Sequence, residues 1–151
     1  MSLPVSAPLA GTVTTLAEVP DEVFAAQMVG PGVSVAPDGG GAVLVLAPVG
    51  GTIVKLHPHA FVITVPDGPS VLVHVGIDTV ELKGRHFTLH ATQGQVVAAG
   101  EPVVTVDVDA VQDAGYSAAC PVVVLGAAPD TVDSDVVGRR VEAGDRLYEL
   151  P

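Results

Sequence analysis

Glycine and proline recur at short intervals along the whole chain, and this spacing limits the length of any regular element. The 17 glycines and 13 prolines separate segments rich in valine, which favours strands. The predicted strands are Thr12–Leu16, Gly32–Ala36, Ala42–Leu46, Thr52–Leu56, Ala60–Val65, Ser70–Val75, His86–Ala91, Pro102–Val106, Val122–Leu125 and Arg146–Leu150. The best helix candidate, Asp107–Ala114, is also short. The pattern predicts an all-β fold, an antiparallel β-sandwich or barrel-sandwich with at most short helices.

Two stretches of the sequence are each repeated once, and every copy has the pattern of a turn that leads into a strand. Ala7–Val13 (APLAGTV) is echoed by Ala47–Ile53 (APVGGTI), and Gly94–Val103 is echoed by Gly138–Leu147. Because only two copies of each occur, they predict a compact fold with pseudo-repeated strand units and not a solenoid. We expect residues 1–151 to form a single domain, since a chain of this length can bury roughly 70% of its unfolded surface.

The charge of the chain restricts the partners that it can bind. The net charge is −11, with only six Lys and Arg. This argues against nucleic acid, whose phosphates require a basic surface. The same charge suits a basic protein partner, and solubility alone would also explain it.

Neither export nor a membrane span is expected from the sequence. The N-terminus has no basic region followed by an apolar core, and no apolar run reaches about 20 residues. A cytoplasmic protein is the simple expectation. The single cysteine, Cys120, excludes an internal disulfide and lies beside a valine-rich segment, so it is predicted to be a buried hydrophobe.

Two histidines lie in apolar segments that a short loop connects. If Pro66–Pro69 forms a loop of four residues, His59 lies opposite Gly76, one diagonal step from His74 on the same face. A loop that differs by one residue would place the rings on opposite faces. Near neutral pH, such a pair can supply a nucleophile, a proton carrier or a metal ligand.

Five motifs along the chain form a set. They are Ala7–Gly11 (APLAG), Val19–Phe24 (VPDEVF), Ala47–Ile53 (APVGGTI), His59–Phe61 (HAF) and His74–Gly84 (HVGIDTVELKG). Together they resemble the glucose-type enzyme IIA domain of the bacterial sugar phosphotransferase system, over nearly the whole chain. The last motif is long and specific, and the separation of His59 and His74 matches the paired histidines of the family.

The resemblance implies a phosphotransferase component that works through a phosphohistidine and needs no cofactor. His74 would accept the phosphoryl group from the HPr phosphocarrier protein and pass it to a sugar-specific enzyme IIB, the partner of the IIC permease. His59 would stabilise the phosphoryl oxygens by a hydrogen bond. A backbone carbonyl is expected to hold the other nitrogen of His74, with Gly76 allowing the backbone to come close. Sugar specificity would belong to the membrane partner, so glucose, N-acetylglucosamine and other glycosides all fit.

A docking surface around His74 is expected to be apolar at its centre and acidic at its edge. The candidates for the centre are Val23, Phe24, Leu72 and Val75, and those for the edge are Asp21, Asp78 and Glu81. Core packing is an alternative role for Phe24 and Leu72.

One position departs from the family pattern. Many members carry a threonine two residues before the supporting histidine, where this chain has His57. His57 either replaces that threonine as the residue that orients His74 or points to solvent. His86 and His90 lie outside the motifs and are expected at the surface.

A zinc-dependent hydrolase is the alternative from another class of function. His57, His59 and His74 could supply three nitrogen ligands and leave an open position for water. Zinc bound opportunistically by His59 and His74 would be compatible with a phosphoryl carrier as well. A purely regulatory module, controlled by its phosphorylation state, is a third possibility.

Overall fold

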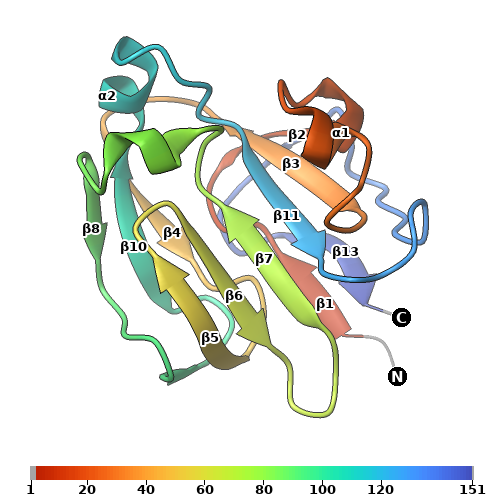
Figure 1. The fold of residues 1–151 in the computed structure, drawn as a ribbon. Coiled ribbons are helices and arrows are strands. Elements are labelled where there is room, and N and C mark those ends of the chain that lie inside the picture. Colours follow the sequence, from red (N-terminus) through yellow and green to blue (C-terminus); the bar gives the residue numbers. More distant parts are fainter. Residues whose placement is uncertain (1–2, 151) are drawn as a thin grey trace.

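The computed structural model describes residues 3–150 and consists of short strands with few helical turns (Figure 1). The strands are β1 (Leu3–Ser6), β2 (Gly11–Thr15), β3 (Gly32–Pro37), β4 (Ala42–Leu46), β5 (Gly51–His57), β6 (Ala60–Thr64), β7 (Ser70–His74), β8 (Phe87–Leu89), β9 (Val96–Val97), β10 (Pro102–Asp107), β11 (Cys120–Val124), β12 (Arg140–Val141) and β13 (Arg146–Leu150). The helices are α1 (Glu22–Ala25), α2 (Val108–Asp113) and the 3₁₀ turns η1 (Leu16–Glu18) and η2 (Thr79–Leu82). The all-β fold with at most short helices is therefore confirmed.

The strands form one large antiparallel sheet and two small ones. The large sheet has the order β12-β2-β3-β11-β7-β6-β5-β9, and the small sheets are β4-β10-β8 and β1-β13. In Figure 1, β11, β7, β6 and β5 lie in front of β4, β10, β1 and β13. The main hydrophobic cluster contains buried side chains from all three sheets, so the core lies between the large sheet and the two small ones.

The two sequence repeats make equivalent contacts. Ala7 exchanges two backbone hydrogen bonds with residues 144–145, of 2.7 and 2.9 Å, and Ala47 exchanges two with residues 100–101, both of 2.8 Å. The large sheet has the same symmetry, because β12-β2-β3-β11 from one edge corresponds to β9-β5-β6-β7 from the other. The predicted pseudo-repeat is therefore a property of the fold, and its axis lies between β11 and β7.

The two halves differ in one connection. Residues 16–31, which include η1 and α1, join β2 to β3, whereas residues 58–59 alone join β5 to β6. The longer connection covers the outer face of β11 and β7, where a second cluster of buried side chains forms. Its members are Leu16, Val19, Phe24, Ile77 and Val123. The short β5–β6 turn leaves the equivalent face of the other half open.

The register of the β6–β7 hairpin differs by one residue from the prediction. Ala60 pairs with His74 and Thr64 with Ser70, so that residues 65–69 form the loop. Val65 belongs to the turn, because its N–H donates to the Pro69 carbonyl at 3.0 Å. The predicted loop of four residues was therefore wrong.

His59 nevertheless meets His74, because His59 is not part of a strand. It is the second residue of the turn between β5 and β6, so the alternation of side chains along a strand does not fix its direction. The ring centroids of His59 and His74 lie 5.3 Å apart. The prediction that the two rings meet is confirmed, although the register that led to it is not.

The remaining differences concern short elements. The predicted strand 86–91 is reduced to β8, since His86 has a φ of +77°, which strands do not allow. Strands β1, β9 and β12 and helix α1 were not predicted. Cys120 is fully buried, as expected, and burial raises the pKa of its thiol to about 12. Within residues 3–150, no helix has the length and apolar character needed to cross a membrane.

Candidate functional site: a row of rings around His74

Four rings form a row on the outer face of the large sheet. The ring centroid of Phe24, from α1, lies 5.3 Å from that of His74, and His59 follows at 5.3 Å from His74. Both pairs meet edge to face, at 61° and 67°. His57 completes the row, stacked on His59 at 5.6 Å and 21°. His74, the candidate nucleophile, therefore lies between the rings of Phe24 and His59.

Strand register explains how the row arises. His57 pairs with Ala60 across β5 and β6, and Ala60 pairs with His74 across β6 and β7. These three side chains therefore project from one face of the sheet. The small side chain of Ala60, only 8% exposed, leaves space between the two histidines for the ring of His59, which comes from the adjacent turn.

The Gly76 carbonyl defines the tautomer of His74. Nδ1 of His74 lies 2.5 Å from this oxygen. A carbonyl oxygen can only accept, so the proton is on Nδ1 and the lone pair is on Nε2. Gly76 has a φ of +83°, and a Cβ there would lie 2.5 Å from Thr79 Cγ2. The expected backbone partner and the need for glycine at position 76 are therefore both present.

Thr79 supports this bend and was missed by the sequence analysis. Its side chain is buried, and its hydroxyl donates to the Val75 carbonyl at 2.7 Å. Ile77 N–H donates to the Ser117 carbonyl at 2.9 Å on the other side of the bend. The position of Thr79 in the His74–Gly84 motif is the sequence signal that could have identified it.

Both central histidines are neutral near pH 7. Burial lowers the pKa of His74 below its usual 6.5, against the opposing effects of the Gly76 hydrogen bond and of Asp21 and Asp78. Burial also lowers the pKa of His59, and the positive charges that His74 and His57 can carry lower it further. His74 therefore offers an unprotonated Nε2, as a nucleophile requires.

Helix α1 presents Phe24 to His74. The Asp21 carboxylate caps the helix by accepting from the N–H groups of Val23 at 2.8 Å and Phe24 at 3.3 Å. Beyond the helix, Gln27 and Asp130 exchange two hydrogen bonds of 2.8 Å, which fix α1 to the loop after β11. Phe24 is 7% exposed, so it acts mainly as a wall beside His74.

The candidate docking residues divide into exposed and buried groups. Val23 is 43% exposed, and Asp78 and Glu81 are exposed, as a contact surface requires. Val80, which was not considered, is 53% exposed beside them. Asp21 and Leu72 are half-buried, and Leu72 packs against the cluster under α1.

Val75 does not fit the expected surface role. It is 2% exposed and belongs to the main core, because it continues the alternation of β7, in which Val71 and Val73 face the core and His74 faces outward. Its N–H donates to the His59 carbonyl at 2.6 Å, so Val75 joins the two halves of the site through the backbone.

The three-histidine zinc site is not formed. His57 contacts His59 and not His74, so it neither completes a ligand set nor orients His74 as the missing threonine would. Among residues 3–150, no group of three or more His, Cys, Asp and Glu side chains is arranged to hold a metal ion. His86 and His90 are exposed outside the row, as expected.

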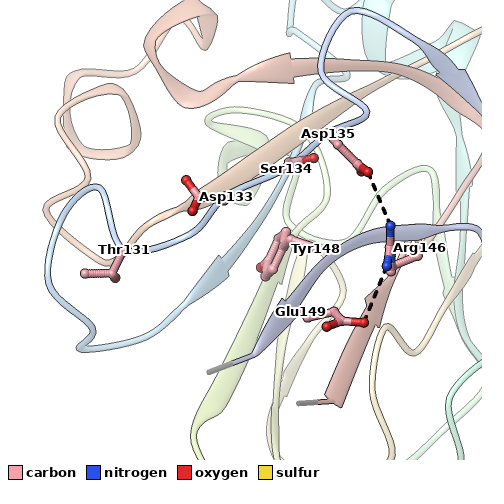
Figure 2. A pocket seen from close by; sticks show the side chains of 7 residues that line it. All are labelled: Thr131, Asp133, Ser134, Asp135, Arg146, Tyr148 and Glu149. Carbon is pink, nitrogen blue, oxygen red and sulfur yellow. Dashed lines mark hydrogen bonds and ion pairs between the residues drawn. The ribbon is translucent and has the colours of Figure 1, made fainter. Parts of the chain in front are cut away.

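A pocket of about 450 Å³ lies away from the rings, between β13 and residues 131–135 (Figure 2). Arg146 spans it, 3.4 Å from both Asp135 and Glu149. The Tyr148 hydroxyl donates to the Val122 carbonyl at 2.9 Å, away from solvent. None of the histidines lines this pocket, so the chemistry is assigned to the row and not to the pocket.

In this antiparallel β-sandwich, a histidine with an unprotonated Nε2 lies beside a second imidazole, an arrangement that suits the class of proteins that carry a group covalently on histidine. The chain belongs to the family described as phosphoenolpyruvate-dependent sugar phosphotransferase system, EIIA 1, whose model matches residues 3–128. It is thus a phosphotransferase component.

One solved structure and one related EIIA component support this assignment. The glucose permease IIA of Mycoplasma capricolum has a structure with a TM-score of 0.90 and 37% sequence identity, over 100% of this chain and 97% of that one. The glucose-specific EIIA component of Bacillus cereus is 39% identical over 120 residues, which are 78% of this chain and 71% of that protein.

Other relatives are longer, multicomponent proteins. The β-glucoside-specific EIIBCA component of Halalkalibacterium halodurans is 36% identical over 97% of this chain, which spans 23% of that protein. The mannose-specific EIIBCA component of Corynebacterium glutamicum is 41% identical over 80% of this chain, which spans 18% of that protein. The chain therefore spans less than a quarter of the length of these relatives.

Proposed function

We propose that His74 accepts a phosphoryl group from the phosphohistidine of HPr and passes it to a sugar-specific enzyme IIB, which works with a IIC permease. The observation that carries this proposal is the hydrogen bond from His74 Nδ1 to the Gly76 carbonyl, which directs the lone pair to Nε2. The EIIBCA relatives combine IIA with IIB and IIC components in one protein, which supports the same partnership for this chain.

The transfer is an in-line displacement at phosphorus. The Nε2 lone pair of His74 forms a bond to phosphorus, while the bond from phosphorus to the HPr imidazole breaks and its electron pair returns to that ring. Onward transfer is the same step with roles exchanged, since the IIB nucleophile attacks and the electron pair returns to His74 Nε2. His59, neutral and at 5.3 Å between ring centroids, donates its N–H to the phosphoryl oxygens as their charge grows.

The charges near His74 favour release of the phosphoryl group. Asp21 and Asp78 are the charged groups that act on its imidazole. Both repel a dianionic phosphoryl group, whereas a fixed cation would hold it in place. A neutral hydrogen-bond donor such as His59 stabilises the transition state without binding the product too tightly, as a relay requires.

The docking surface follows from exposure. Val23 and Val80 supply exposed apolar side chains, and Asp78 and Glu81 supply acidic ones. This composition suits a partner that presents a basic rim around an apolar centre.

Substitution of the two histidines tests the assignment of roles. His74→Gln should abolish phosphorylation by HPr, because the nucleophile is removed. His59→Ala should still accept the phosphoryl group but transfer it to enzyme IIB about 100-fold more slowly, the cost of losing one transition-state donor. Rapid-quench assays with labelled phospho-HPr measure both steps. Labelling of His74→Gln at the wild-type rate would refute the site.

A further inference from the structure

The His59 ring is held in place by other rings. Its backbone is anchored, because the His59 carbonyl accepts from Val75 N–H at 2.6 Å. Within residues 3–150, the imidazole itself makes no hydrogen bond, and its ring neighbours are the edge of His74 and the face of His57. His74 changes its state during transfer, so His57 is the constant neighbour that can define the direction of His59.

His57 is well placed for such a role. It is the last residue of β5, and its pairing with Ala60 fixes its backbone in the sheet. The turn that follows packs against the segment after η2, since a Cβ on Gly84 would lie 3.5 Å from Pro58 Cγ. The His57 side chain is exposed on its other side, so its stacking on His59 is not forced by core packing.

We propose that His57 is a positioning residue, whose stacked ring keeps the His59 imidazole directed at the phosphoryl group on His74. This inference rests on the proposed function and adds to it, because it assigns a role in onward transfer to a residue that touches neither substrate nor the reacting atoms. The positive charge that His57 can carry also helps to keep the His59 imidazole neutral, since it contributes to the lowered pKa of His59. His74 also acts on His59, Asp21 and Asp78 act on His74, and the exposed Lys55 lies two residues before His57 on β5.

Two substitutions separate the ring contact from the charge. His57→Ala removes both, and His57→Phe keeps a flat ring against His59 without a charge. His90→Ala is the matched control, because His90 is exposed and bonded to Thr105 in another sheet. Thermal unfolding of each variant checks that the fold is retained.

The first measurement uses the unphosphorylated protein alone. In ¹H–¹⁵N spectra of the imidazoles, His57→Ala should raise the pKa of His59, because both a covering ring and a like charge are lost. The His57→Phe variant should show a smaller rise, and His90→Ala none. An unchanged His59 titration in His57→Ala would overturn the proposal.

The second measurement is the transfer to enzyme IIB. His57→Ala should lower the kcat of this transfer about tenfold and leave the KM for the partner unchanged. A misdirected His59 N–H weakens the transition state of transfer but not the binding of the partner. His57→Phe should stay within about twofold of wild type. Equal losses in the Ala and Phe variants would overturn the positioning role. If wild-type protein takes no phosphate from HPr, the proposed function fails, and the titration still decides whether the His57 ring stacks on His59 in solution.

Discussion

Gly76 sets the chemistry of His74 through its backbone. Its positive φ turns the carbonyl back toward His74 Nδ1, and its lack of a side chain allows Thr79 to pack against the bend. A residue with a Cβ would meet the Thr79 methyl group at 2.5 Å and the Ser117 carbonyl at 3.1 Å. One glycine thus links the fold to the position of the reactive lone pair.

Gly76→Ala should lower the free energy of unfolding by about 2–5 kcal/mol, the sum of a left-handed backbone and an overpacked site. Gly94→Ala is the control, because Gly94 has a φ of +94° with no atom within 4 Å of an added Cβ. It should lose only about 1–2 kcal/mol, from the backbone alone. Urea unfolding measures both, and equal losses would show that the contact with Thr79 does not matter.

The sequence allows the prediction of the two central histidines but not of the row. The His74 motif and its separation from His59 identify the pair, and the glycine after β7 predicts the backbone acceptor. The stacking of His57 on His59 depends on the β5–β6 turn, where no strand periodicity fixes the side chains. Burial of Val75, by contrast, follows from the alternation of β7, because Val75 lies on the same face as the buried Val71 and Val73 and opposite to His74.

Helix α1 is the element that distinguishes the two halves of the molecule. It occupies the connection for which the other half has only a two-residue turn, and it places Phe24 and Asp21 next to His74. Longer valine-rich strands were predictable from their composition. Strands β9 and β12 have two residues and α1 has four, which is too short for any periodic pattern to be seen.

Substitutions of Asp21 separate its cap from its charge. Asp21→Ala should destabilise the protein by about 1 kcal/mol through loss of the cap, whereas Asp21→Asn should retain the cap and most of the stability. Because the carboxylate raises the pKa of His74, both variants should lower that pKa further. Imidazole NMR titration measures it. A pKa of His74 that rises or stays constant in Asp21→Asn would contradict the assigned electrostatic contact.

At the scale of the whole molecule, the net charge of −11 and the exposed acids near His74 imply electrostatic steering of a basic partner. Asp67 is also exposed, but it lies in the β6–β7 loop, at the other end of β7 from His74, so it can serve as a control for acids near His74.

The rate of association with HPr should therefore fall about tenfold as salt rises from about 0.01 to 0.5 M. The double variant Asp78→Asn/Glu81→Gln should bind more slowly and depend less on salt than wild type. Asp67→Asn should resemble wild type. Stopped-flow association across this salt range makes the comparison. Identical salt dependence in all three proteins would show that steering does not act through the surface around His74.

The identity of the phosphorylated atom tests the proposed phosphoryl relay most directly. The protein is incubated with phosphoenolpyruvate, enzyme I and HPr, and the acid-labile phosphate is located by mass spectrometry and ³¹P–¹⁵N NMR at neutral pH. We expect a single phosphohistidine at Nε2 of His74, because Nδ1 is held by the Gly76 carbonyl. Phosphate on His59, on Nδ1 of His74 or on no histidine would contradict it.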